Sequence, residues 1–258
     1  MEEKHMFVCP VCGSGEWIKR YDIGRWNIGE CETCGFAQVD PLPLQESRAE
    51  CYSEEKVVER NIKQKSGLQK FSRTMKRLFR QAAGWDKSWI FYDKLRRCLS
   101  PGSKILDVGC GDGSFLRKAK EDFNCTGIEI SDYLASLARK QEGIKAITGN
   151  FLSTDFRDEK YDAITLISLL EHLEDPERAA RKCFGLLNKG GALLLKTVNY
   201  GCLNRKVVGK GWTGFRPPDH VVYFSPSNLR MFLKKIGFSK IDIHAWPFND
   251  SMYCEASK

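Results

Sequence analysis

The sequence lacks any hydrophobic run long enough to cross a membrane, and it has no internal repeat or low-complexity tract. A membrane-spanning helix needs about 20 predominantly apolar residues, so no such helix is expected. The first five residues, MEEKH, also lack the basic and then apolar pattern of a signal peptide. These absences predict a cytoplasmic protein. With 258 residues and 42% apolar composition, the chain can bury the core of one large domain with an appendage.

The chain has eleven cysteines, an odd number, so they cannot all pair in disulfides. An odd count in a chain without an export signal argues against a disulfide framework and for reduced thiols or a metal. Four cysteines form two C-x-x-C pairs with eighteen residues between the pairs, which is the spacing of a four-cysteine zinc site. The four expected ligands are Cys9, Cys12, Cys31 and Cys34.

A glycine follows the second cysteine of each pair, in CPVCG and CETCG, and lets the chain curl around a metal. The segment 17–30 between the pairs alternates apolar and polar residues well enough for a short hairpin, so we expect a zinc ribbon. A redox pair or a catalytic zinc is the alternative. Four thiolates close the coordination sphere and leave no position for a substrate, which favours a structural Zn²⁺.

The dinucleotide-binding fingerprint G-x-G-x-x-G lacks its third glycine in this chain. The stretch 105–116, ILDVGCGDGSFL, indicates a buried strand, a glycine-rich turn and a helix, with Gly109 and Gly111 in the turn and Ser114 in place of the last glycine. Turns of this kind lie at the carboxyl ends of parallel strands, where open α/β sheets bind nucleotide-like cofactors. A carboxylate at Asp107 would oppose a pyrophosphate at the helix start and suit a cationic cofactor.

A second acidic residue, Glu129, closes the strand 125–130 twenty residues after Gly109. At this spacing a carboxylate can accept both hydroxyls of a ribose. From residue 100 onward, short apolar strands alternate with helices, which predicts parallel strands with right-handed crossovers. A late helix is expected from Ser225 to Lys235, ended by Gly237. The other expected elements are strands near 104–109, 125–130, 144–148, 161–167 and 191–198, and helices over 112–122, 132–142 and 176–188.

Five motifs in this order resemble the class I S-adenosylmethionine-dependent methyltransferases: ILDVGCGDGSFL, GIEIS, TGNF, YDAITLISLLEHLEDP and LLNKGGALLLKTVN. The resemblance covers about residues 88 to 258. It implies a Rossmann-like, doubly wound α/β fold with a mostly parallel seven-stranded sheet, finished by an antiparallel hairpin over 239–246 and 251–257.

The same resemblance implies S-adenosylmethionine as the cofactor and names its site. Turn residues hold the methionine end, the acidic residue binds the ribose, and two residues after the third strand flank the adenine. These are Asp107, Gly109 and Gly111, then Glu129, then Asn150 and Phe151, with Cys110, Ile130 and Ser168 completing the implied site.

Methyl transfer to a hydroxyl needs a group that removes the proton. His172 is the first candidate, because it follows a predicted central strand and an imidazole titrates close to neutral pH. In many small-molecule methyltransferases that this segment resembles, the Glu-His pair lies at the active site. The alternative is a histidine that only caps or orients the loop. His220 is the second candidate, in RPPDHVVYFS between the fifth strand and the late helix.

The segment before His220 is expected to bind the acceptor. In GKGWTGF, flexible glycines surround two aromatic residues, which could form a lid and stack on a planar or sugar-like molecule while a neighbouring cation meets a phosphate. The alternative is a surface loop packed by its own aromatics. The expected acceptor residues are Lys210, Trp212, Phe215, Arg216 and Tyr223.

Residues 56–97 carry thirteen Lys and Arg and three acidic residues. Their net charge of +10 exceeds the whole chain's formal net charge of +8. Apolar residues recur at intervals of three and four between Leu68 and Ala82, the period of an amphipathic helix. One face should therefore pack and the other should be basic. The helix is a solvated connector, a cover of the active site that attracts an anionic substrate, or a contact for nucleic acid or a membrane surface.

The N-terminal half, with CPVCG, CETCGF, DPLP and then CYS, is similar to zinc-ribbon methyltransferases that commonly modify sugars or other small hydroxylated acceptors. We expect three parts: a zinc ribbon over 1–45, a basic helical connector or lid over 46–99, and an S-adenosylmethionine-binding domain over 100–258.

The leading hypothesis is a methyltransferase for a small polar acceptor, such as a sugar or nucleotide-sugar hydroxyl, with an anionic acceptor favoured by the basic segment. A second hypothesis is an RNA methyltransferase. Amino-group methylation of bases usually comes with an Asn/Asp-Pro-Pro-aromatic motif after the fourth strand, and 168–171 holds SLLE instead. A third is a zinc-ribbon binding protein without turnover, against which the intact glycine turn and Glu129 argue.

Overall fold

The computed structural model describes residues 8–43 and 87–258. The chain divides into two compact units, each described here by itself. We call the unit with the four-cysteine segment the ribbon unit and the unit with the glycine-rich turn the turn unit. They comprise Met1–Ser47 with Ile164–Lys258, and Arg48–Ala163, respectively.

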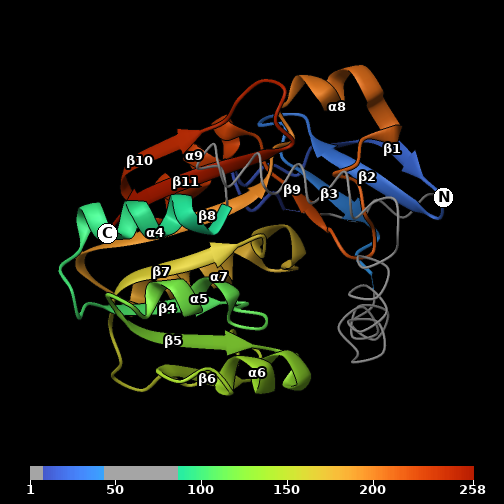
Figure 1. Cartoon of the computed structure of the whole chain (residues 1–258). Helices are drawn as coiled ribbons and strands as arrows, with labels where there is room; N and C mark the ends of the chain where they lie inside the picture. Colours follow the sequence, from blue (N-terminus) through green and yellow to red (C-terminus); the bar gives the residue numbers. More distant parts are fainter. Residues whose placement is uncertain (1–7, 44–86) are drawn as a thin grey trace. The chain divides into compact units, whose positions relative to one another are not determined.

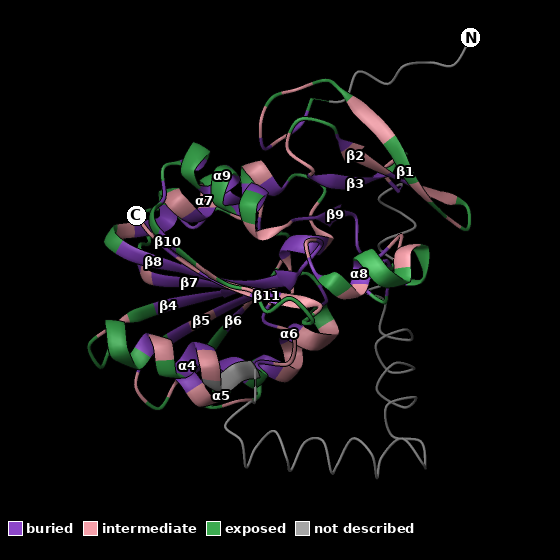
Figure 2. Ribbon diagram, turned by 90° about the horizontal axis from the view of Figure 1, so that it is seen from above, coloured by how far each residue is buried: buried purple, intermediate pink, exposed green. Residues whose placement is uncertain are grey.

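Three parallel strands form the core of the turn unit (Figure 1). Strand β4 (Lys104–Val108) pairs with β5 (Asn124–Glu129), and β5 pairs with β6 (Ile144–Thr148). They alternate with α5 (Ser114–Ala119) and α6 (Asp132–Arg139). All of β4 after its first residue is buried, as expected for a strand covered on both faces. Figure 2 shows the strands largely buried and the helices with one buried and one exposed face.

The ribbon unit contains the later strands and helices of the methyltransferase-like pattern. Its elements follow the predicted order, although the strand expected at 191–198 begins earlier, at Leu187. The hairpin implied by the resemblance is present, because the last two strands pair antiparallel. The elements are β7 (Tyr161–Ile167, which begins in the turn unit), α7 (Pro176–Leu186), β8 (Leu187–Val198), α9 (Pro226–Ile236), β10 (Ser239–His244) and β11 (Ser251–Ser257).

The ends of α9 are those that the sequence predicts. The hydroxyl of Ser225 accepts the backbone N–H of Asn228, while the Asn228 side chain accepts the N–H of Ser225. This reciprocal pair satisfies two of the four N–H groups that a helix start leaves unpaired. At the other end Gly237 has φ +118°, a conformation that favours glycine and ends the helix.

The main sheet has seven strands in the order β10-β11-β8-β7-β4-β5-β6. Strand β11 pairs antiparallel with β8 and with β10, whereas β4, β5 and β6 are parallel. The expected Rossmann-like α/β fold with a seven-stranded sheet is therefore confirmed.

A second, four-stranded sheet lies in the ribbon unit. The expected hairpin is formed by β1 (Trp17–Ile23) and β2 (Trp26–Cys31), which pair antiparallel. Two strands that the sequence did not predict extend it, β3 (Ala37–Asp40) and β9 (Val222–Tyr223). Their antiparallel pairing joins the segment after Cys34 to the segment after His220.

Most of the basic segment 56–97 lies outside the described residues. Its described part is α4 (Lys87–Cys98), which buries Phe91, Tyr92 and Leu95 and exposes Arg96 and Arg97. The amphipathic helix expected between Leu68 and Ala82 lies wholly outside the described residues, so its packed and basic faces stay a prediction. Among the described residues, no helix has both the length and the apolar character that crossing a bilayer requires. The three expected parts, 1–45, 46–99 and 100–258, stay a prediction.

Candidate functional site

The four expected zinc ligands converge in the ribbon unit. The sulfurs of Cys9 and Cys34 are 3.5 Å apart, those of Cys12 and Cys31 are 3.6 Å apart, and all four lie within 4.8 Å of one another. Tetrahedral zinc with Zn–S bonds of about 2.3 Å needs sulfurs about 3.8 Å apart, whereas a disulfide joins sulfurs about 2.0 Å apart. The spacing therefore fits a metal and does not fit disulfides.

The glycine after each cysteine pair has the role that the sequence predicts. Gly13 and Gly35 have φ +79° and +69°, and their N–H groups donate to the carbonyls of Cys9 and Cys31 at 2.9 and 2.8 Å. Each loop thus curls back beneath its pair of sulfurs. Burial raises the pKa of Cys9 to about 11, which favours the neutral thiol. A bound cation would favour the thiolate form of all four cysteines.

The glycine turn of the turn unit follows β4 directly. Gly109, Gly111 and Gly113 have φ +72°, +56° and +78°, conformations that favour glycine. The N–H of Gly109 donates to the carbonyl of Ile128 at 2.8 Å, which ties the turn to β5. Among the described residues, no atom beyond its chain neighbours lies within 4 Å of the position that a Cβ of Gly111 would take, so a ligand can approach this backbone closely.

Two more of the expected cofactor residues in the turn are buried. Asp107, at the end of β4, is 2% exposed. Burial, with the charges of Asp107 and Glu129, holds the pKa of the Cys110 thiol well above its usual range. The Cys110 side chain packs against Gly127 of β5 as a neutral group. Any part that Cys110 takes in cofactor binding therefore falls to its backbone.

The carboxylate of Glu129 joins the turn to the next loop. Its Oε2 accepts the N–H of Gly111 and its Oε1 accepts the N–H of Ser131, both at 2.9 Å. A carboxylate has about four acceptor positions, so each oxygen can accept a further hydrogen bond. Glu129 can thus hold the turn in place and still receive the two hydroxyls of a ribose, as its spacing predicts.

Three more of the expected cofactor residues follow strand ends: Ile130 comes directly after Glu129, and Asn150 and Phe151, expected to flank the adenine, come after β6. Ile130 is 54% exposed, which is unusual for an isoleucine and presents an apolar surface. The side-chain oxygen of Asn150 accepts the N–H of Leu152 at 2.8 Å and so shapes the loop after β6. Phe151 is buried, so its ring belongs to the core in this structure.

Ser168 lies in the ribbon unit, at the end of β7. It has φ +55°, which is uncommon for a residue other than glycine. Its N–H donates to the carbonyl of Lys196 at 2.8 Å, and the Lys196 ammonium donates to its hydroxyl at 2.5 Å. Strained conformations of this kind gather at functional sites, so the geometry is consistent with the role expected of Ser168.

The packing beneath the turn leads to a first prediction, Gly127→Ala. The added Cβ would lie 2.6 Å from the Cys110 sulfur and 2.9 Å from Leu116, and both contacts are steric clashes. We expect the free energy of unfolding to fall by about 1–3 kcal/mol and the affinity for the cofactor to fall, because Cys110 must move. Gly185→Ala, in α7, is the control, since its added Cβ meets no described atom within 4 Å outside the nearby backbone of its own helix.

Denaturant unfolding and calorimetric titration with S-adenosylmethionine measure the two effects of Gly127→Ala. A Gly127→Ala protein as stable and as tight-binding as Gly185→Ala would show that the turn tolerates a shift of Cys110.

The two candidate bases lie together in the ribbon unit. His172 ends a short 3₁₀ helix, η2 (Leu170–His172), that follows β7. Its ring and that of His220 meet edge to face, with centroids 4.8 Å apart. Nitrogen and oxygen atoms of Glu171, His172 and His220 lie within 4.8 Å of one another. Glu171 is buried, and its Oε2 accepts the hydroxyl of Thr197 at 2.8 Å.

The surroundings of His172 favour its protonated form. Its Nδ1 lies 2.8 Å from the carbonyl oxygen of Asp219 and 3.0 Å from the carboxylate Oδ1 of the same residue. Both oxygens only accept, so Nδ1 carries the hydrogen and Nε2 the lone pair. Burial opposes a charge on the ring, but the hydrogen bond to Asp219 and the charge of Glu171 outweigh it and raise the pKa of His172 above 6.5.

His220 has the opposite character. It is 4% exposed, and its Nδ1–H donates to the carbonyl of Gly214 at 2.8 Å. Burial, the neighbouring charge of His172 and that of Arg216 lower the pKa of His220 to about 4. At neutral pH it is an uncharged ring. The structure thus brings the two candidates together and gives them opposite shifts.

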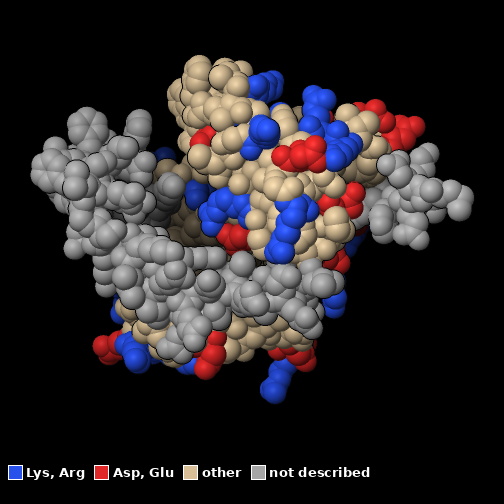
Figure 3. Space-filling view, turned by 90° about the vertical axis from the view of Figure 1, so that its right-hand side faces the viewer, with Lys and Arg blue, Asp and Glu red and all other residues tan. Residues whose placement is uncertain are grey.

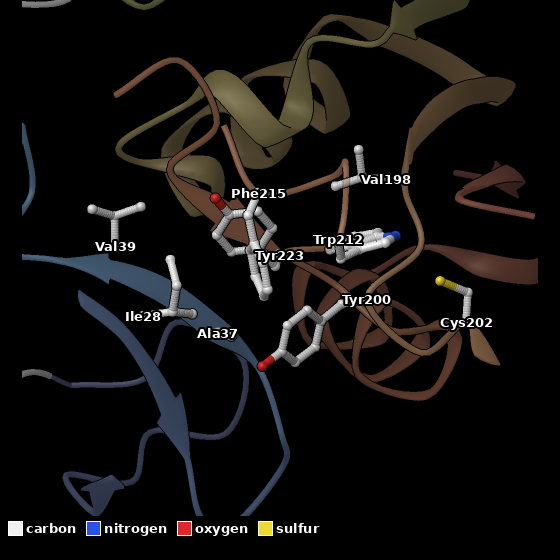
Figure 4. Packing of buried hydrophobic residues seen from close by; sticks show 9 residues of the cluster. All are labelled: Ile28, Ala37, Val39, Val198, Tyr200, Cys202, Trp212, Phe215 and Tyr223. Atoms are coloured by element: carbon white, nitrogen blue, oxygen red, sulfur yellow. The ribbon is translucent and has the colours of Figure 1, made fainter. Parts of the chain in front are cut away.

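The expected aromatic lid is contradicted by burial. Trp212, Phe215 and Tyr223 are 3%, 8% and 0% exposed. Figure 4 shows their rings gathered with Tyr200 on one side and side chains of the ribbon, such as Ile28, on the other. Trp212 and Phe215 have ring centroids 5.2 Å apart, and Phe215 and Tyr223 are equally close. These rings form a core and are not available to stack on an acceptor.

Polar contacts fix the same rings. The indole N–H of Trp212 donates to Asp250 at 2.8 Å, and the hydroxyl of Tyr223 donates to the carbonyl of His220 at 2.8 Å. A buried aromatic ring with a satisfied polar group is a packing element. These rings therefore pack the ribbon against the segment that carries His220, and they do not stack on an acceptor as expected.

The two expected cations have different surroundings. Lys210 is exposed on η3 (Gly209–Gly211), where it lines a hollow with residues of β1 such as Lys19. Arg216 donates to Oδ2 of Asp219 at 2.5 Å. The sequence analysis did not single out Asp219 as a site residue. Its position next to His220 was visible, but its partner is His172, 47 residues earlier in the chain.

Comparison with known proteins gives sequence relatives for the central part of the chain. A family model described as a methyltransferase domain matches residues 68–243. The ubiquinone biosynthesis O-methyltransferase of Coxiella burnetii is 29% identical over 154 residues, covering 55% of this chain and 66% of the relative. The protein of the same name from Actinobacillus pleuropneumoniae is 35% identical over 109 residues, covering 38% and 47%. The chain thus spans less than two thirds of the length of these relatives.

Solved structures show the same fold. The magnesium protoporphyrin IX methyltransferase of Synechocystis PCC 6803, determined with bound SAH, superposes with a TM-score of 0.62 at 20% identity, over 84% of this chain and 100% of that chain. An S-adenosylmethionine-dependent methyltransferase of Mesorhizobium loti gives 0.52 at 19% identity, over 64% and 96%. With the motifs in order, the seven-stranded sheet and the family model over more than half of its length, the chain belongs to the class I S-adenosylmethionine-dependent methyltransferase family.

Proposed function

We propose that this protein transfers a methyl group from S-adenosylmethionine to a hydroxyl of a small polar molecule, with His172 as the general base. The observation that carries the proposal is the pair of oxygens of Asp219 on Nδ1 of His172, at 2.8 and 3.0 Å. They leave the lone pair on Nε2, the atom that would accept the proton. A hydroxyl acceptor needs such a base because its proton must leave as the new bond forms.

When bound, S-adenosylmethionine supplies an electrophilic methyl group together with its leaving group. We assign the methionine end to the turn and the ribose to Glu129. The supports are the open backbone at Gly111 and the further acceptor positions on both Glu129 oxygens. Asp107 suits the cationic methionine end, because a buried carboxylate favours a positive neighbour. The exposed Ile130 offers an apolar surface for the adenine.

We also propose that the four cysteines hold a structural Zn²⁺. The sulfur separations of 3.5 and 3.6 Å support this assignment, as do the two glycine turns beneath them. With four thiolates bound, zinc has no open position. Its part in the reaction would be to hold the ribbon together.

For the acceptor, the relatives' names support oxygen as the target atom, because two of them are O-methyltransferases. A sugar or nucleotide-sugar hydroxyl is the acceptor that we propose to test first, among other hydroxylated molecules. On the face seen in Figure 3, the described Lys and Arg side chains are interspersed with Asp and Glu, so the described residues of this face do not favour RNA. An RNA-binding surface gathers cations on one face.

The test is a transfer assay with methyl-labelled S-adenosylmethionine and three separate acceptor pools: hydroxylated small molecules including nucleotide-sugars, RNA, and protein. Label is expected in the small-molecule pool, in a product that is stable to base as an ether. Glu129→Ala is the control, since it removes the proposed ribose ligand and should abolish incorporation into every pool. Label entering RNA or protein alone would reject the proposed acceptor class.

A further inference from the structure

The contact between Asp219 and His172 is built from two buried side chains on different segments. Asp219 is 8% exposed and belongs to the loop before β9, while His172 ends η2. Backbone hydrogen bonds fix the loop on both sides: the N–H of Asp219 donates to Arg216 at 2.8 Å, and the N–H of Val221 donates to the carbonyl of Glu171 at 2.8 Å. The spacing of Asp219 and His172 is therefore set by the backbone.

A buried carboxylate is costly unless its charge is used. The Oδ2 atom of Asp219 has Arg216 as its partner at 2.5 Å. Its Oδ1 atom lies 3.0 Å from Nδ1 of His172 and has no other hydrogen-bond partner among the described residues. A purely structural role would leave this buried oxygen without a compensating charge, whereas a positive charge on His172 would be stabilised by it.

His220 provides an internal comparison. Both rings are buried and both donate Nδ1–H to a backbone carbonyl, but no carboxylate oxygen stands beside Nδ1 of His220 at a comparable distance among the described contacts. The ring with the carboxylate has its pKa raised, and the ring without it has its pKa lowered to about 4. Neighbouring groups whose pKa values are pushed apart mark the acid–base assignment of a site.

We propose that Asp219 is the positioning residue that makes His172, and not His220, the general base of the reaction. Its carbonyl oxygen fixes the tautomer with the lone pair on Nε2, and its carboxylate stabilises the ring once the proton of the acceptor hydroxyl has moved to Nε2. His172 and, to a smaller extent, Arg216 hold the pKa of that carboxyl well below its usual range, so it stays ionised. The inference rests on the proposed function, because it assigns a supporting role in the same proton transfer.

The charged and titratable groups around His172 come from three segments. Glu171 lies on its own helix, Asp219, Arg216 and His220 lie on the loop, and Lys196 on β8 is engaged with Ser168. Asp219 contacts Nδ1 of His172 through its carbonyl oxygen at 2.8 Å and its Oδ1 at 3.0 Å. Asp219→Asn keeps the volume and the backbone carbonyl but removes the charge, so it tests the charge alone.

We expect Asp219→Asn to lower kcat by about 10²- to 10⁴-fold, the range found for losing a general base or its supporting carboxylate, with little change in KM. The acid limb of the pH–rate profile should also move to lower pH, because the charge that raises the pKa of His172 is gone. Asp219→Glu should recover part of the rate. The control is Asp242→Asn, which removes the carboxylate of an exposed pair with His244, 2.9 Å apart, and should change neither quantity.

A second readout needs no turnover. Nitrogen-15 NMR of histidine-labelled protein reports the titration and tautomer of His172 directly, with His172→Gln used to assign its signal. We expect a titration above pH 6.5 in the unmodified chain and a lower one in Asp219→Asn. An unchanged titration, or a kcat that falls with no movement of the acid limb, would overturn the inference. A shifted titration in a protein that methylates no acceptor would instead overturn the proposed function and leave the contact standing.

Discussion

Loss of the metal from the four-cysteine site is expected to stop methyl transfer without abolishing cofactor binding. The reason is the packing of the ribbon. Strand β3 follows Cys34 and pairs with β9, and the N–H of Val39 donates to the carbonyl of Val221 at 2.9 Å. Val221 in turn donates to Glu171. The ribbon therefore holds the segment that carries Asp219 and His220.

The two C-x-x-C loops of the cysteine cluster also contact α9 directly. The side-chain N–H of Asn228 donates to the carbonyl of Cys34 at 3.4 Å, and the Lys235 ammonium donates to the carbonyl of Pro10 at 2.9 Å. Structural zinc contributes about 10–16 kcal/mol of binding energy in small zinc-finger peptides, more than a ribbon of this size could replace. Without it, β3 would lose its fold and β9 its partner.

Cys31→Ser is the variant to measure, with Cys98→Ser, an exposed cysteine outside the cluster, as the matched control. We expect one equivalent of zinc in the control and less in Cys31→Ser, a lower Tm, and a kcat reduced by 100-fold or more. Affinity for S-adenosylmethionine should change by less than about threefold, since its proposed ligands are in the turn unit apart from Ser168. A metal-free protein with full turnover would contradict this role of the ribbon.

Replacing the two histidines separately should give unequal effects. We expect His172→Ala to lower kcat by about 10²- to 10⁴-fold, the contribution of a general base, and to leave affinity for the cofactor nearly intact. His220→Ala should act mainly on stability, because it removes a buried ring and its hydrogen bond to Gly214. Exposed His244→Ala serves as the control for both.

The pH dependence separates the two histidines further. A base must be neutral to act, so kcat rises with pH through the pKa of that base. With His172 as the base, the acid limb lies above pH 6.5, because the folded protein raises its pKa. With His220 as the base, the limb would lie near pH 4. A kcat independent of pH between 5 and 8, or a fully active His172→Ala enzyme, would remove His172 from the mechanism.

Much of the fold could be predicted because its signals are local. The strands around the glycine turn are short buried runs, and their ends are marked by Gly109 and Glu129. The four-cysteine cluster depends on a spacing that is visible in the chain, and α9 on its capping residues Ser225 and Gly237. In each case the information lies within a few residues of the feature that it predicts.

The rest of the site depends on contacts between distant segments. Strands β3 and β9 have four and two residues, too few for a hydrophobic period, and their pairing joins Ala37 to Tyr223. Trp212 and its aromatic neighbours looked like a lid because glycines surround them. They are buried because the ribbon covers them, as Figure 4 shows. The contact between Asp219 and His172 could not be predicted either, because the two residues lie 47 positions apart in the chain.

The central claim is that the turn unit binds S-adenosylmethionine through the glycine turn and Glu129. Calorimetric titration of the purified chain with S-adenosylmethionine tests it most directly, beside Glu129→Gln, which keeps the side-chain volume, and Gly185→Ala as the control. We predict one site per chain, unchanged in Gly185→Ala and at least tenfold weaker in Glu129→Gln, a loss of about 1.4 kcal/mol or more. Folded protein that gives no binding heat, or a Glu129→Gln variant that binds as tightly as the unmodified chain, would contradict it.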